Sequence, residues 1–97
     1  MRLKDFRETF LEELRQPEFA AGYLQAALEE NDLDTFLVAL RDVVQANGGM
    51  EKAVRETALA RETLSKSLSE SGNPQFSTVQ AVLKSVGLQV SIIANPG

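Results

Sequence analysis

The chain has 97 residues, of which 43% are hydrophobic and 25% are charged, and it contains neither cysteine nor histidine. This length and balance are typical of one small globular domain and not of a disordered chain. Without cysteine or histidine, a disulfide framework, a zinc site and a Ser-His triad are excluded. Because no apolar run approaches membrane-spanning length and the first residues lack a signal peptide's hydrophobic segment, we expect a single cytoplasmic domain, residues 1–97, with no membrane partner.

The net charge of −4 is unevenly distributed along the chain. Residues 1–36 carry four basic and nine acidic side chains, a net charge of −5, whereas residues 37–97 carry six basic and five acidic ones, a net charge of +1. Non-specific nucleic-acid binding depends on neutralisation of phosphates by basic side chains, so the negative net charge argues against a protein that binds nucleic acids non-specifically. The acidic N-terminal third, including Glu29 and Glu30, is a candidate contact for a basic partner, and a merely solvated acidic surface is an equally good interpretation.

Helical periodicity dominates the first half of the chain. Residues 4–14 have apolar side chains at helical spacing and end before Pro17, which suits the first turn of a second helix. Asp32 is the predicted N-cap of a third helix, and the apolar positions of residues 33–44 repeat at intervals of three and four. Gly48 and its neighbours end that helix, because glycine adopts the left-handed conformation readily. The apolar stripes of the three helices include Phe6, Phe10, Leu14, Phe19, Leu24, Leu28, Leu33, Phe36, Leu37, Leu40, Val43 and Val44.

The stretch from residue 50 to residue 69 is predicted to form two short helices joined by a tight turn. Ala53, Val54 and Leu59 are expected to pack inward, and Leu64 and Leu68 form the buried stripe of the second helix. The outer face of the second helix is then polar and partly basic: Arg61, Glu62, Ser65, Lys66 and Ser69. Helix-turn-helix proteins present such a helix to the DNA major groove, where these side chains can donate to guanine, accept from cytosine and reach phosphates. Two ordinary helices of a bundle are the alternative, and spacing alone favours DNA binding only slightly.

The C-terminal part is predicted to contain one more helix and a short strand. Ser77 with Gln80 forms a capping box, Phe76 belongs to the inward-facing stripe, and Gly87 ends the helix. The alternation of residues 88–93 predicts a β-strand with Leu88, Val90 and Ile92 on one side. Because a lone strand has no partner within the chain, we expect it to pair with its copy in a homodimer or to join the sheet of another protein.

A resemblance adds to this interpretation. From about Phe19 to Ile92 the chain resembles the HigA-like antitoxins, addiction-module antidote proteins with a Cro/repressor-type helix-turn-helix. The residues that carry it are YLQAALEENDLDTFLVALRDVV, GGMEKAVRETALARETLSKSLSESGNP and STVQAVLKSVGLQVSI, and the run RETLSKSLS followed by GNP is the most specific part. The resemblance implies an all-α, lambda-repressor-like helix-turn-helix domain, with extra N-terminal helices and a short C-terminal β-strand. It also implies binding to double-stranded operator DNA, repression of its own operon, and neutralisation of a RelE-like toxin.

The resemblance also implies roles for single residues. Arg61, Glu62, Ser65 and Lys66 match the base-facing positions of helix-turn-helix proteins. The positions better placed for phosphate contacts are Lys52, Arg55, Ser69 and Asn73.

The chain departs from the family at three positions. Ala58 replaces a turn glycine, Ala60 replaces the serine that precedes the second helix, and Glu51 replaces the usual cap of the first helix. An alanine at positive φ costs about 1 kcal/mol, and loss of a serine cap costs roughly 0.5–2 kcal/mol.

Catalysis is not expected from this sequence. Neighbouring glutamates in one helix do not face each other, and no serine has a base. Gly48-Gly49 lacks the lysine and the spacing of a phosphate-binding loop. We therefore expect no enzyme activity, no cofactor and no metal site. Two alternatives to the DNA-binding antitoxin stay open: a toxin-binding interaction module that does not bind DNA, and a stand-alone phage-type repressor.

Overall fold

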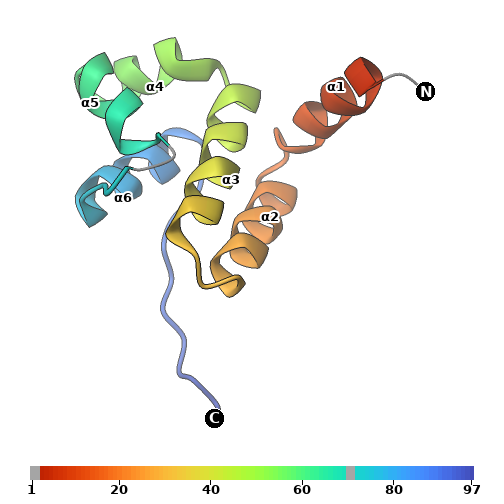
Figure 1. Ribbon diagram of the computed structural model, residues 1–97, viewed down its shortest axis with the longest axis vertical. Helices are drawn as coiled ribbons and strands as arrows, with labels where there is room; N and C mark the ends of the chain where they lie inside the picture. Colours follow the sequence, from red (N-terminus) through yellow and green to blue (C-terminus); the bar gives the residue numbers. More distant parts are fainter. Residues whose placement is uncertain (1–2, 70–71) are drawn as a thin grey trace.

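The computed structural model describes residues 3–69 and 72–97, and this part of the chain forms six helices and no strand. In chain order (Figure 1) these are α1 (Leu3–Glu13), α2 (Pro17–Glu29), α3 (Leu33–Ala46), α4 (Gly49–Thr57), α5 (Arg61–Ser67) and α6 (Phe76–Ser85). The expectation of an all-α chain is therefore confirmed at this level. None of the described helices combines the length and the apolar character needed to cross a bilayer.

The starts of α2 and α3 follow the sequence signals. Pro17 occupies the first turn of α2, where its missing N–H removes no hydrogen bond. Asp32 caps α3: its carboxylate accepts hydrogen bonds from the Asp34 backbone N–H at 3.3 Å and from the Thr35 hydroxyl at 2.8 Å. Between the two helices Asn31 has φ of +58°, a conformation that asparagine tolerates better than most residues. This tight turn sets α2 and α3 side by side (Figure 1).

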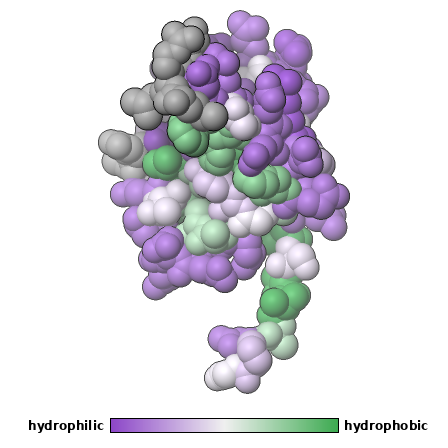
Figure 2. All heavy atoms as spheres, turned by 90° about the vertical axis from the view of Figure 1, so that its right-hand side faces the viewer, coloured by the Kyte–Doolittle hydropathy of each residue, from purple (hydrophilic) through white to green (hydrophobic). Residues whose placement is uncertain are grey.

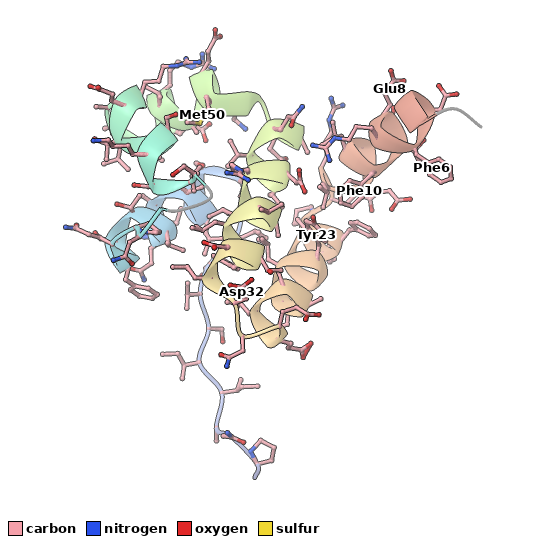
Figure 3. All side chains as sticks on the ribbon, viewed as in Figure 1. Phe6, Glu8, Phe10, Tyr23, Asp32 and Met50 are labelled. Carbon is pink, nitrogen blue, oxygen red and sulfur yellow. The ribbon has the colours of Figure 1, made fainter. Side chains whose placement is uncertain are left out.

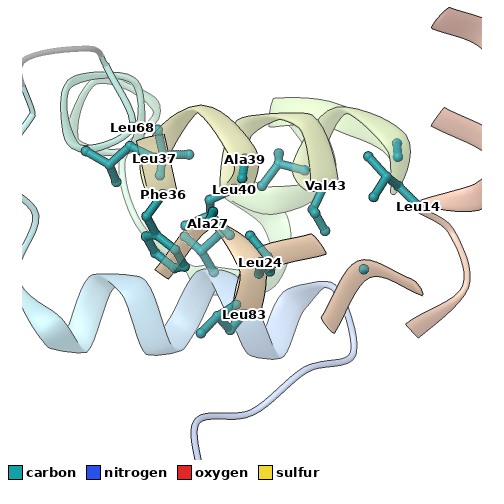
Figure 4. Packing of buried hydrophobic residues seen from close by; sticks show 14 of the residues in the cluster. Leu14, Leu24, Ala27, Phe36, Leu37, Ala39, Leu40, Val43, Leu68 and Leu83 are labelled. Atoms are coloured by element: carbon teal, nitrogen blue, oxygen red, sulfur yellow. The ribbon is translucent and has the colours of Figure 1, made fainter. Parts of the chain in front are cut away.

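Helix α3 is the centre of the hydrophobic core. Its Leu37, Leu40 and Val43 have no exposed surface, and side chains from α2 and α6 pack around it (Figure 4). The other side chains with no exposed surface are Leu14, Leu64 and Val82, which come from the segment after α1, from α5 and from α6. Helix α3 thus packs directly against α1, α2 and α4, and α4 in turn packs against α5 and α6.

A polar cluster joins α1 and α2 to α3. The Arg7 guanidinium contacts Asp42 Oδ1 at 2.9 Å, and the Tyr23 hydroxyl donates to Asp42 Oδ2 at 2.8 Å. The Phe10 ring meets the Tyr23 ring edge to face, with centroids 5.1 Å apart (Figure 3). Burial, the hydrogen bond to Asp42 and the charge of that carboxylate raise the pKa of Tyr23 from 10.0 to about 12.

The predicted start of α6 is wrong. The helix begins at Phe76, and Gln75 occupies the cap position without a side-chain cap. The Gln75 carbonyl accepts hydrogen bonds from the backbone N–H groups of Thr78 and Val79 at 3.0 and 3.2 Å, so the helix starts before Ser77 can cap it. Phe76 is 61% exposed and does not belong to the buried stripe. Gly87, with φ of +83°, ends the helix as predicted.

The predicted strand at residues 88–93 is also wrong for a single chain. Leu88 packs against the core, whereas Val90 and Ile92 are 40% and 91% exposed. The tail leaves the body of the molecule as an extended segment (Figure 1), and Figure 2 shows that its middle is hydrophobic. The backbone of the tail is extended, but no neighbouring segment forms a hydrogen-bond ladder with it, so the tail is not a β-strand.

Candidate nucleic-acid interface

Helices α4 and α5 are joined by only three residues, 58–60, as the sequence predicted. Gly48 precedes α4 with φ of +104°, which glycine adopts without strain. Ala53, Leu64 and Leu68 are buried, and Val54 and Leu59 are half-buried against the core. The apolar sides of both helices therefore face α3 and α6, and their polar sides face outward.

The turn between the two helices contains a strained alanine. Ala58 has φ of +60°, and its backbone N–H donates to the Val54 carbonyl at 3.1 Å. The Thr57 hydroxyl donates to the Ala53 carbonyl at 2.7 Å and accepts from the Leu59 backbone N–H at 3.2 Å. Ala60 is the cap residue of α5 and offers no side-chain acceptor to the first turn. Thr57 thus supplies a side-chain hydrogen bond to a turn in which Ala58 is strained and Ala60 provides no cap.

The four residues assigned to base contacts are brought together on one exposed helix. Arg61, Glu62, Ser65 and Lys66 are all exposed on α5, and none of their side chains forms a hydrogen bond or ion pair with another described residue. Long side chains that are free to move can adapt to base edges and phosphates. The outer face of α5 therefore presents two cations, one carboxylate and one hydroxyl.

The residues assigned to phosphates are less uniform. Arg55 is exposed on α4, whereas Lys52 is half-buried and lies 3.9 Å from the Glu56 carboxylate. The Ser69 hydroxyl donates to the Lys66 carbonyl at 2.7 Å, so a phosphate contact would require that bond to break. Asn73 is exposed but lines a hollow between α5 and α6, on the opposite flank of α5 from the hollow lined by Ser65 and Ser69.

Two residues that sequence reasoning did not assign hold the end of α5. The Arg41 guanidinium donates to the Leu68 carbonyl at 2.7 Å, which places a positive charge at the negative end of the helix dipole. A Cβ at Gly72 would lie 2.8 Å from the Lys66 carbonyl oxygen and closer still to that of Ser67, so only glycine fits there. In the sequence, Arg41 could have been noticed as a charged residue next to Leu40, which is fully buried. Gly72 could have been noticed as the first residue of the GNP motif.

The charge of the surface changes from one end of the molecule to the other. Helices α4 and α5 carry four cations and three carboxylates. The acidic N-terminal third contributes exposed side chains from α1, α2, the turn before α3 and the first turn of α3: Glu8, Glu12, Glu13, Glu18, Glu29, Glu30, Asp32 and Asp34. No group of three or more acidic residues in residues 3–69 and 72–97 is arranged to hold a metal ion. The acidic surface thus lies on elements other than α4 and α5.

Comparison with known proteins assigns this arrangement to a family. The model of the family described as probable addiction module antidote proteins matches residues 3–94, and the chain belongs to that family. A relative in Haemophilus influenzae, itself an uncharacterized protein, is 38% identical over 90 residues, which cover 93% of this chain and 90% of the relative. No solved structure matches the chain. Family membership implies an antitoxin role and, in general, a toxin partner.

Proposed function

We propose that this protein is a DNA-binding antitoxin of a type II toxin–antitoxin module that represses its own operon in the cytoplasm. The observation that carries the proposal is the exposed face of α5, where the side chains of Arg61 and Lys66 form no hydrogen bond or ion pair with other described residues. α4 supports this helix from one side, and Arg41 anchors its end to α3. A rigidly held helix with free polar side chains is what a helix-turn-helix protein requires, since the side chains must reach base edges from a fixed position.

The proposed DNA complex contains two copies of the chain. Single helix-turn-helix units make few base contacts, and repressors of this class bind two half-sites about one helical turn apart. The segment 88–93, which is exposed from residue 89 onward and forms no strand in the single chain, supports a homodimer, because pairing with its copy would satisfy its backbone groups and cover Val90 and Ile92.

The proposed toxin is a small basic ribonuclease of the RelE-like class. The antidote family supports a toxin partner, and the exposed acidic side chains of α1 and α2 support a basic one. Binding and not catalysis is the proposed activity of this chain, with neither cofactor nor metal.

A second candidate is a toxin-binding module that does not bind DNA. Two residues of the turn before α5 support this candidate. Ala60 leaves the first turn of α5 without a side-chain cap, and Ala58 is strained. In that case the exposed cations of α5 would be ordinary surface residues.

One experiment separates these candidates. The full-length chain is co-expressed with the product of the neighbouring gene and mixed with a DNA fragment from upstream of its own gene. The proposal predicts co-purification of the neighbouring protein and retardation of that fragment in a gel, with less retardation of an unrelated fragment. Co-purification without retardation would favour the interaction module, and retardation without a toxin-sized neighbour would favour a stand-alone repressor.

A further inference from the structure

An apolar groove runs between the junction of α2 and α3 on one side and α6 on the other. Its volume is about 450 Å³. Leu28, Leu33 and Phe76 line it and are 54%, 48% and 61% exposed, which is unusual for large apolar side chains in so small a protein. Leu24 and Leu83 form its buried floor.

The C-terminal tail begins in this groove and then leaves it. Leu88 and Val90 line the groove, but Ile92 and Ile93 are 91% and 84% exposed and contact nothing that covers them. Figure 2 shows this hydrophobic part of the tail outside the body of the molecule. Among the described residues, nine large hydrophobic side chains are exposed: four line the groove and two more are these isoleucines. The exposed apolar surface of the chain is therefore concentrated in a groove and in the segment that leaves it.

The groove and the tail are both free of charged side chains, which indicates the kind of segment that can occupy the groove. None of the residues that line the groove is charged, and residues 85–97 contain no charged side chain. An apolar segment can therefore fill the groove without burying a charged side chain. The chain itself supplies such a segment, because its own tail is apolar and uncharged, so a second copy can bring one to the groove.

We propose that the groove of one copy receives the Ile92–Ile93 segment of a second copy, and that the exchange is reciprocal. The place where the tail leaves the groove supports this. Residues 88–91 line the groove of their own chain, and Ile92 is the first residue of the tail that lies outside it. In an antiparallel pair of tails, a register that sets Ile92 against the partner's Val90 places Ile92 beside a residue that lines the partner's groove.

This inference deepens the dimer of the proposed function, to which it adds the surface that the tail occupies. It is tested without DNA, so that its failure is distinct from a failure of DNA binding. The chain has no cysteine, and Leu28→Cys and Ile92→Cys both change exposed side chains. The two variants, carrying different affinity tags, are mixed and treated with a short bis-maleimide. Val38→Cys mixed with Ile92→Cys is the matched control, because Val38 is 40% exposed but lies outside the groove.

The expected result is a cross-linked heterodimer for the pair 28–92 at several times the yield of the pair 38–92. Sedimentation of Ile92→Asp should also show a monomer where the parent chain is a dimer, with an unchanged circular dichroism spectrum. Equal yields for the two pairs would overturn the inference. A monomer product from a chain carrying both Leu28→Cys and Ile92→Cys, with no dimer product, would overturn it as well, because the tail would then fold back on its own groove.

Discussion

The Thr57 hydroxyl accepts a hydrogen bond from the backbone N–H of Leu59 at 3.2 Å, across a residue whose φ is +60°. That residue, Ala58, is the end of α4 and the start of the turn to α5. The side chain of Thr57 therefore helps to fix the angle at which α5 leaves α4, while the Cβ of Ala58 opposes the conformation that the turn requires.

Replacing Ala58 by glycine should stabilise the protein. Glycine adopts positive φ without the steric cost that alanine bears, so we expect Ala58→Gly to raise the free energy of unfolding by about 1 kcal/mol. The measurement is urea denaturation followed by circular dichroism. Ala26→Gly, an exposed position inside α2, is the matched control and should lower the free energy of unfolding by about 1 kcal/mol. A loss of stability in both variants would show that Ala58 is not strained.

The stability of the folded chain should fall at high pH through Tyr23. Its pKa is raised to about 12, so the folded state holds the phenolic proton more tightly than the unfolded state. The stability that this group contributes is complete below pH 10 and is lost between about pH 10 and pH 12, an effect of about 1 kcal/mol once solvent screening is allowed for.

The same titration can be followed directly, because Tyr23 is the only tyrosine and the chain has no tryptophan. The ultraviolet absorbance of tyrosinate should rise near pH 12 in the parent chain and at lower pH in Asp42→Asn, which keeps an acceptor but removes the charge. An identical midpoint in the two chains would contradict the role given to Asp42.

Reversing two charges at the end of α2 should weaken the toxin complex. Glu29 and Glu30 are exposed, and lysine at a helix C-terminus is favourable for the helix, so Glu29→Lys/Glu30→Lys should fold normally. We expect slower association of the toxin in surface plasmon resonance, and a weaker dependence on salt. The neutral pair Glu29→Gln/Glu30→Gln should give a smaller effect of the same sign. Unchanged kinetics at low and high salt in both pairs would place the contact elsewhere.

Much of the fold followed from local signals in the sequence. The periodicity around Leu37 and Leu40, the Asp32 cap and Pro17 each predict their element, because each acts within one helical turn. The buried and exposed faces of α4 and α5 followed from the same spacing. Patterns of this kind depend only on residues that are close in sequence, so the structure of the single chain reproduces the elements that they predict.

The errors have a different origin. Ser77 resembles a cap, but the chain after Pro74 already provides the Gln75 carbonyl to the first turn of α6. The strand at residues 88–93 depends on a neighbour that a single chain does not contain. The contact between Arg41 and the Leu68 carbonyl joins positions 27 residues apart, and no local pattern reports it. Tertiary contacts of this kind hold α5 in place. Sequence alone could therefore predict which face of α5 is exposed, but not which residues hold the helix in position.

The central claim is that the exposed face of α5 reads DNA, and it is tested most directly by measuring the affinity of Arg61→Ala for the fragment upstream of the gene. Fluorescence anisotropy at fixed salt gives the dissociation constant, and Lys84→Ala, which removes an exposed cation from α6, is the control of equal charge. We predict that Arg61→Ala weakens binding by about tenfold or more, and Lys84→Ala by much less. Equal affinities for Arg61→Ala and the parent chain would contradict the claim.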